Sequence, residues 1–206
     1  MKKYIKLEKS KITLRKALIQ LLSERDFSKI TINDICQQAN VGRSTFYNHY
    51  KDKIALLEDV VSFYSRIAND TTYAAFVTED HLDLHANLLR DYHTIVEYHK
   101  IIQALYPVHL PNADFEGDVR AMLARKYKLL LDSNPAQNCI PKALAVELYT
   151  ANALLVTKYI AYHADTANIE QLADFMFSIY QTILSPIESP AKAELPADKE
   201  ETIEIK

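Results

Sequence analysis

The chain has very little glycine: its 206 residues include only Gly42 and Gly117. Phosphate-cradling loops and the tight turns of β-rich folds rely on glycine, because glycine enters the positive-φ region at no steric cost. This scarcity argues against a Gly-rich nucleotide-binding loop and against a fold of many short strands. Helices are the remaining way to organise a chain in which 49% of residues are hydrophobic.

Cysteine and long apolar runs are also scarce. Cys36 and Cys139 lie far apart and form no C-x-x-C or metal-spaced motif, which fits a reducing compartment. The N-terminal residues are partly basic and lack the apolar segment of a signal peptide. No uninterrupted apolar run is long enough to span a bilayer. We therefore expect a cytoplasmic protein that does not contact a membrane.

The sequence lacks the common catalytic signatures. It has no Walker-type phosphate loop, no G-x-S-x-G elbow, no H-E-x-x-H helix and no kinase-like motif set. His81 and His85 are four residues apart, with Asp80 and His93 not far along the chain. A metal site would need a third ligand that the sequence does not identify, and exposed histidines at a helix start explain the pair equally well. We predict a protein that is not an enzyme and holds no metal or other cofactor.

Charge is distributed unevenly along the chain. The formal net charge is −3, yet residues 1–66 contain 13 Lys+Arg against 7 Asp+Glu, and the rest of the chain contains 11 against 20. A basic N-terminal part joined to an acidic remainder allows nucleic-acid phosphates to attract one end of the molecule. A chance distribution of surface charge gives the same totals, so charge alone does not decide the function.

Apolar residues recur at helical spacing almost throughout, which predicts an all-α fold. The first helix is expected at about 10–25, with Leu14, Leu18, Leu21 and Leu22 on one face. A short helix starting at Thr31 follows, and Thr31 and Asp34 are spaced like an N-cap and its N3 partner. The other predicted helices cover about 43–49, 52–76, 81–105, 116–132, 141–163 and 168–185. Residues 186–206 are rich in proline and charge and are predicted to form a disordered tail.

The segment from Phe27 to Leu57 carries the most specific pattern. Its two short helices are separated by a turn at Ala39-Asn40-Val41, where Asn40 tolerates the left-handed conformation that such turns require. Gly42 is then placed at the N-cap of the next helix. This arrangement predicts a helix-turn-helix, whose second helix enters the major groove of DNA.

At these positions the chain resembles the tetracycline-repressor-like (TetR/AcrR) family of regulators. It departs from the family pattern at Asn40, where glycine is usual, and at Gly42, where serine or threonine is usual. The resemblance implies a three-helix DNA-binding domain over 1–52, a larger helical regulatory and dimerisation domain over 53–185, and the tail. It is carried by Ile30-Thr31, Asp34-Ile35, Ala39-Asn40-Val41, the run Thr45-Phe46-Tyr47-Asn48-His49-Tyr50, and Lys53-Ile54-Ala55-Leu56-Leu57.

The resemblance also implies DNA-binding roles. Arg43 and Ser44 would approach base edges, and arginine's fork of donors suits guanine. Thr31 and Lys53 would clamp backbone phosphates at two helix starts. For Arg43 and Lys53 the alternative is an ordinary solvated charge.

Phosphate contacts that set the register on DNA are implied for four further residues, Thr45, Tyr47, Asn48 and His49. Two of them have alternatives: Tyr47 as a half-buried packing residue, and His49 as a cation at a helix C-terminus. Phe46 and Tyr50 are assigned to the core.

The C-terminal part predicts dimerisation and ligand binding. The helices at 141–163 and 168–185 carry apolar faces that would pair across a two-fold axis, or else be buried within one protomer. A pocket is expected among the helices of 67–132, with no individual residue assigned.

The predicted function is that of a homodimeric transcription regulator, a repressor, that binds an inverted-repeat double-stranded DNA operator. A small-molecule effector is expected to control it. The alternative is a helical scaffold or interaction protein that has lost DNA binding. Retention of Arg43, Tyr47, His49 and Lys53 favours the regulator.

Overall fold

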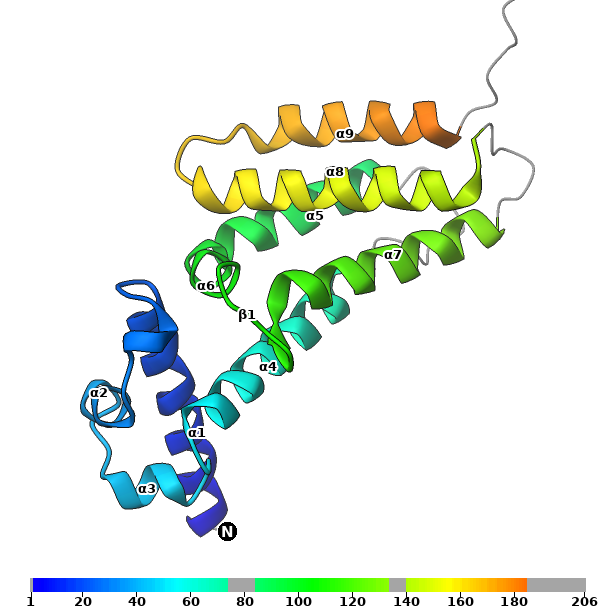
Figure 1. Ribbon diagram of the computed structural model, residues 1–206. Coiled ribbons are helices and arrows are strands. Elements are labelled where there is room, and N and C mark those ends of the chain that lie inside the picture. The colour runs from blue at the N-terminus through cyan, green and yellow to red at the C-terminus, as the bar shows by residue number, and fades with distance from the viewer. Residues whose placement is uncertain (1, 74–83, 134–139, 185–206) are drawn as a thin grey trace, which may run out of the picture.

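The computed structural model describes residues 2–73, 84–133 and 140–184, and within this part of the chain the fold is helical as predicted (Figure 1). A small N-terminal unit, the head (residues 2–52), lies at one end. A larger helical body, which begins with the helix at Lys53, extends from it. The elements are α1 (Lys2–Leu22), the 3₁₀ helix η1 (Phe27–Lys29), α2 (Ile32–Gln38), α3 (Arg43–Tyr47), α4 (Lys53–Tyr73), α5 (Leu84–Glu97), α6 (His99–Leu105), β1 (His109–Leu110), β2 (Ala113–Asp114), α7 (Phe115–Ser133), α8 (Lys142–Tyr162) and α9 (Ile169–Leu184).

Three details differ from the sequence-based expectation. The first helix begins at Lys2 rather than near residue 10. The segment predicted as one helix over 81–105 contains two, α5 and α6, with a break at Tyr98. Apolar spacing continues across that break, so periodicity does not reveal it. A two-residue antiparallel pairing of β1 with β2, which was not predicted, leads into α7.

The turns of the head follow the local sequence signals. Thr31 caps α2 in a full capping box: its Oγ1 accepts from the amide of Asp34 at 3.2 Å, and the Asp34 carboxylate accepts from the amide of Thr31 at 2.8 Å. Asn40 has a φ of 52°, the left-handed conformation predicted for it. Gly42 is the N-cap of α3, also as predicted, and contributes no side-chain hydrogen bond. Phe46 and Tyr50 are buried, which confirms them as core residues.

The carboxylate of Asp59 on α4 joins three parts of the head. It accepts two hydrogen bonds from the guanidinium of Arg15 on α1, at 2.6 and 2.9 Å, and one from the hydroxyl of Tyr50 at 2.7 Å. Lys11 lies 3.3 Å from the same carboxylate. Burial by itself would raise the pKa of Asp59, but these donors outweigh it and lower the pKa to about 2. Asp59 is therefore ionised and fully bonded at neutral pH.

Lys53, the first residue of α4, holds the segment before α2. Its ammonium donates to the backbone carbonyls of Phe27, Ser28 and Ile30 at 2.9, 3.3 and 2.6 Å. The ammonium also lies 4.7 Å from the centre of the Phe27 ring. One cation thus bonds carbonyls of η1 and of its C-cap, of which that of Phe27 also accepts from the amide of Ile30 at 3.1 Å.

The head and the body share one hydrophobic core. The cluster that contains Leu14, Leu18 and Phe46 continues through Leu57 into α6, where it includes Leu105. It also reaches the start of α7. A second cluster fills the space between α5, α7, α8 and α9. The helix α4 begins at Lys53, where the sequence placed the domain boundary, but packing continues across that point.

Within the described residues, no helix is long and apolar enough to cross a membrane. The predicted tail, 186–206, lies outside the described residues, as do Phe76 near the predicted end of α4 and the predicted start of the next helix at residue 81.

The Asp59 network makes a prediction about acid stability. A carboxyl group whose folded pKa is depressed stabilises the folded state above its unfolded pKa, near 3.8, and this contribution is lost as pH falls towards 2. A shift of this size corresponds to about 2 kcal/mol. Asp59→Asn should lower the free energy of unfolding at pH 7 by about that amount. It should also flatten the loss of stability on acidification, measured by urea unfolding between pH 7 and pH 3. Asp26→Asn is the control, since its side chain is 79% exposed, and an equal effect of both changes would contradict the assignment.

The contacts of Lys53 predict a difference between two neighbouring lysines. Lys53→Met removes the donor to three carbonyls and should cost about 1–3 kcal/mol of stability, because carbonyls that are partly buried lose their partner. Lys51→Met changes an exposed side chain and should alter stability by less than about 0.5 kcal/mol. Thermal unfolding monitored by circular dichroism measures both. Equal melting temperatures for the two variants would show that the Lys53 contacts do not stabilise the head.

Candidate DNA-binding site

The helix α3 exposes the side chains that the sequence assigned to DNA. Arg43, Ser44, Tyr47 and Asn48 are exposed and Thr45 is half-buried. Tyr47 is 56% exposed, whereas its neighbour Phe46 is fully buried. More than half of the Tyr47 side chain is thus accessible, which favours a contact with DNA over the packing alternative. Phe46 anchors the helix and Tyr47, edge-on to it with ring centres 5.6 Å apart, points outward.

The polar groups on this helix are available to a ligand. In the part of the chain that the structure describes, the side chains of Arg43, Ser44, Thr45, Tyr47 and Asn48 make no hydrogen bond to the protein. Together they offer a guanidinium, hydroxyls and an amide on one surface. This donor set suits phosphate oxygens and base edges.

His49, just beyond α3, has a partner within the head. Its Nε2 lies 2.7 Å from the hydroxyl of Ser10 on α1, and the residue is half-buried. The hydrogen bond fixes the end of the recognition helix against α1. The sequence had left open a phosphate contact or a dipole-stabilising cation, and had not predicted the contact with Ser10.

The two predicted phosphate clamps are engaged inside the molecule. The Thr31 hydroxyl lies 2.8 Å from the Asp34 carboxylate, and Lys53 is bonded to three carbonyls. The hydrogen bond from the Thr31 amide lowers the pKa of Asp34, so the N-terminus of α2 already faces a negative charge. The structure brings both residues near the head surface, with their side chains in structural roles.

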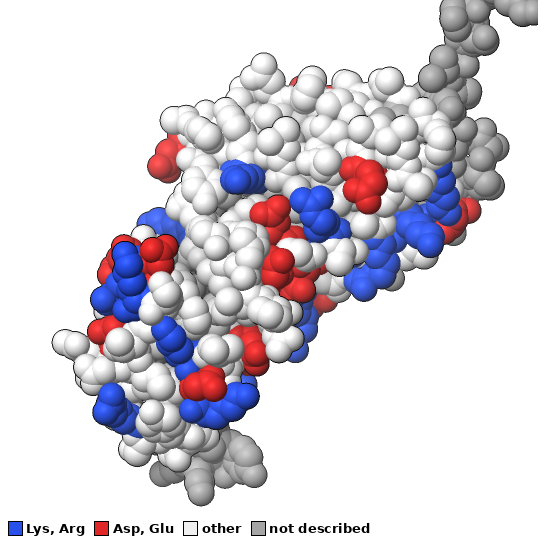
Figure 2. Space-filling model, in the orientation of Figure 1, with Lys and Arg blue, Asp and Glu red and all other residues white. Residues whose placement is uncertain are grey.

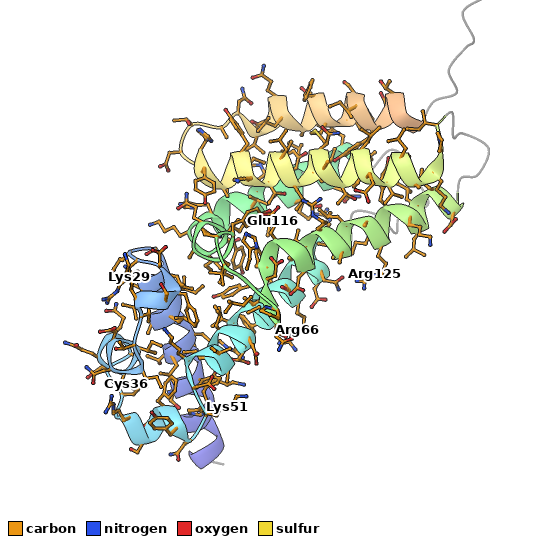
Figure 3. All side chains as sticks on the ribbon, in the orientation of Figure 1. Lys29, Cys36, Lys51, Arg66, Glu116 and Arg125 are labelled. Atoms are coloured by element: carbon orange, nitrogen blue, oxygen red, sulfur yellow. The ribbon has the colours of Figure 1, made fainter. Side chains whose placement is uncertain are left out.

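Lys51 is a candidate that the sequence reasoning missed. It is exposed and lies in the turn between α3 and α4, beside the recognition helix (Figure 3). In Figure 2 lysine and arginine side chains recur on the head surface among acidic ones. The position of Lys51 just after the aromatic run was the signal available in the sequence.

The body contains a cavity of about 110 Å³ beside α4. Residues of α4, α5, α6, α7, α8 and α9 line it. The lining therefore includes residues outside the range 67–132 in which the pocket was predicted. The predicted range does contribute apolar residues to the lining, among them Leu88, Tyr92, Ile95, Tyr98 and Ile102. The walls contributed by Tyr149, Ala153, Thr157 and Tyr180 were outside the predicted range.

An uncovered apolar stripe runs along α8. Leu144, Leu148, Ala151, Leu155 and Tyr159, the face identified from the sequence, are all exposed. Leu155 is 66% exposed, and Phe175 on the adjacent α9 is 60% exposed. The alternative that this face is buried within one protomer is therefore wrong for α8. In Figure 1, α8 and α9 lie side by side at the edge of the body farthest from the head.

Potential metal ligands do not gather in the described residues, where no group of three or more His, Cys, Asp or Glu could hold an ion. His85 pairs with Asp174 at 2.8 Å. His81 lies outside the described residues. Cys36 is buried in the core of the head.

Comparison with known proteins supports the interpretation of the head. Residues 14–60 match the family model described as "Bacterial regulatory proteins, tetR family". An uncharacterised helix-turn-helix transcriptional regulator of Bacillus subtilis (strain 168), YxbF, is 33% identical over 84 residues, 40% of this chain and 21% of the relative. The chain thus aligns with only about a fifth of that curated relative.

Solved structures extend the similarity to the whole fold. A TetR transcriptional regulator from Streptococcus agalactiae is 25% identical, with a TM-score of 0.62 over 87% of this chain and 97% of the other. NalD of Pseudomonas aeruginosa, described as the secondary repressor of a multidrug efflux pump, is 14% identical, with a TM-score of 0.64 over 87% and 98%. Proteins of this family are DNA-binding regulators rather than enzymes. The head thus matches the model of bacterial regulatory proteins of the tetR family, and the fold over most of the chain is similar to that of solved TetR regulators.

Proposed function

We propose that the protein is a homodimeric repressor that binds an inverted-repeat DNA operator and releases it when a small molecule occupies the body. The observation that carries the proposal is the group of polar side chains on α3, which are accessible and make no hydrogen bond to the described residues. By contrast, Thr31 and Lys53 form hydrogen bonds within the protein. The role as repressor draws on NalD, which carries that description. Since its target is bacterial DNA, the protein acts in the cytoplasm.

On DNA, α3 lies in the major groove with Arg43 and Ser44 at base edges. Tyr47, Asn48 and Thr45 bind phosphates and set the register. Lys51 adds an exposed cation beside them. Thr31, His49 and Lys53 serve the interface mainly by fixing α2 and α3, since their side chains bond within the head.

The stripe on α8 supports a two-fold dimer. An exposed apolar face of this length marks a surface that is covered in the working molecule. Pairing α8 and α9 with their copies forms a four-helix interface. A two-fold dimer presents two identical recognition helices, which suits an inverted repeat.

Ligand control follows from the position of the cavity. Residues of α4 line it, including Tyr64, Ala68 and Thr71. The other end of α4 carries Asp59, which holds Tyr50 and Arg15. A ligand that displaces the cavity end of α4 therefore changes the orientation of the head. A coupling of about 1–3 kcal/mol is enough to change DNA affinity by about 5- to 150-fold.

A scaffold protein without DNA binding is the second candidate. It would need its apolar stripe and cavity but not a free Arg43 or an exposed Tyr47. The exposure of both favours the regulator.

The first prediction concerns base reading. Arg43→Ala should relax base preference at one position of each half-site and weaken operator binding by about 1–3 kcal/mol, because a bidentate contact is lost. Tyr47→Phe should weaken binding to all sequences alike. Lys128→Ala, an exposed change on α7, is the matched control and should leave affinity unchanged. The measurement is selection of genomic fragments followed by fluorescence anisotropy at two salt concentrations. Unchanged affinity and preferred sequence in Arg43→Ala would show that the base-reading assignment is wrong.

The second prediction concerns the dimer. Leu155→Asp and Phe175→Asp should each yield monomers, because the interface would bury an unpaired carboxylate. Leu129→Asp changes a side chain of similar exposure, 62%, on α7 and should leave the dimer intact. Sedimentation velocity at micromolar concentration distinguishes the species. A monomeric wild-type protein, or dissociation by Leu129→Asp alone, would contradict the α8–α9 interface.

A further inference from the structure

The cavity beside α4 has an unusual lining. Its walls are mostly aliphatic and aromatic, and among the described residues that form them Asp91 is the only charged one. Five tyrosines share the lining: Tyr64, Tyr92, Tyr98, Tyr149 and Tyr180. A carboxylate in such surroundings is costly unless a partner is present, because burial removes its hydration.

Within the protein, Asp91 is incompletely satisfied. Among the described residues its carboxylate accepts no hydrogen bond, although Lys126 on α7 and Arg90 on α5 exert a favourable charge effect on it. Arg90 is exposed, and Lys126 lies outside the cavity lining and donates to the backbone carbonyl of Asn69 at 2.5 Å. Burial raises the pKa of Asp91 to about 7 despite both cations.

The tyrosines add a second independent feature. Tyr92, next to Asp91, is 5% exposed, and its hydroxyl has no hydrogen-bond partner in the described part of the structure. The ring centres of Tyr149 and Tyr180 lie 4.3 Å apart in the same wall, and the pKa of Tyr180 is raised by burial, with a smaller contribution from the charge of Asp91. Asp91 thus shares the cavity wall with several tyrosines, including Tyr92, whose hydroxyl is unpaired.

We propose that the effector is a small organic cation, with an ammonium group beside Asp91 and an apolar body along the aliphatic wall. The inference rests on the proposed function in taking this cavity as the effector site. Lys126 is buried outside the lining and offsets the charge of Asp91 only in part, whereas an ammonium places a cation inside the cavity. The ammonium can also donate to the Tyr92 hydroxyl and is attracted to aromatic faces. An anionic ligand would meet the carboxylate at close range, and a neutral donor could hydrogen-bond to it but would add no counter-charge.

The cavity also limits the size of the ligand. A cavity of about 150 Å³ in another protein admits benzene, and this one measures about 110 Å³. A short alkyl chain therefore fits as the cavity stands, whereas a ring that carries a short chain has to displace part of the wall. Because Ile67, Ala68 and Thr71 of α4 form part of the wall, the body of such a ligand contacts the helix that carries Asp59.

Calorimetric titration of the full-length protein tests the proposal with three probes of similar shape. These are 2-phenylethylammonium, 3-phenylpropanamide and 3-phenylpropionate, which carry positive, zero and negative charge. The cation is expected to bind more tightly than the neutral amide, and the anion not at all. Preference for the anion would point to Lys126 as the polar anchor and would overturn the proposal, as would equal binding of cation and amide.

Variants connect the binding to Asp91. Asp91→Asn keeps the size of the side chain and should weaken the cation by more than about ten-fold, because the counter-charge is lost, while binding of the amide stays the same. Asp174→Asn removes an exposed carboxylate of α9 that does not line the cavity and should have no effect. Circular dichroism shows whether Asp91→Asn folds. Tyr92→Phe, which deletes only the unpaired hydroxyl, provides a second variant and should weaken the cation less than Asp91→Asn. Equal cation affinity in wild type and both variants would overturn the proposal.

DNA binding is measured separately. If the cation binds through Asp91 but leaves operator affinity unchanged, the cation site stands and ligand control of DNA binding fails. If wild-type protein binds no operator at all, the proposed regulator role fails, while the three-probe comparison still decides the ligand chemistry.

Discussion

The orientation of the head relative to α4 depends on the partly buried carboxylate of Asp59. It is the acceptor for Arg15 on α1, for the Tyr50 hydroxyl after α3, and for Lys11. A carboxylate has enough lone pairs to accept from several donors at once, and charge-assisted bonds of this kind are roughly twice as strong as neutral ones. Since Asp59 belongs to α4, both α1 and the residue Tyr50 just after α3 are fixed to α4. The direction of α4 therefore sets the position of α3 relative to the body.

The helix α4 extends from the head into the body. Near its start Lys53 holds the carbonyls before α2, and near its other end Thr71 and Thr72 line the cavity. A packed helix transmits displacement because its backbone hydrogen bonds keep it stiff, and close-packed neighbours do not deform gradually. Under the proposed ligand control, a displacement at the cavity would reach Asp59 through α4 itself, and Asp59 contacts Tyr50 just after α3.

The polar groups of the head named above have hydrogen-bond partners, whereas several buried polar groups of the body have none among the described residues. In the head, Asp59, Tyr50, Thr31 and Lys53 all have partners. In the body, the hydroxyls of Tyr92, Tyr106 and Tyr127 have none among the described residues, and Asp91 lacks a hydrogen bond there. Leaving such groups unpaired costs free energy. Asp91 and Tyr92 are the two that line the cavity, so a ligand that pairs with them there would stabilise the body.

The sequence by itself determined the features that depend on near neighbours. Helical periodicity located the helices, the Thr31–Asp34 spacing predicted the capping box, and Asn40 predicted the left-handed turn, because each of these is decided within a few residues. Periodicity also identified the α8 stripe, although whether one protomer covered it was visible only in the fold. The tertiary structure alone decided the partners that are distant in sequence: Arg15 with Asp59, Lys53 with the η1 carbonyls, Ser10 with His49, and the cavity walls from α8 and α9 around Asp91. No local pattern encodes these contacts, since they arise from how rigid helices pack once their apolar faces are buried.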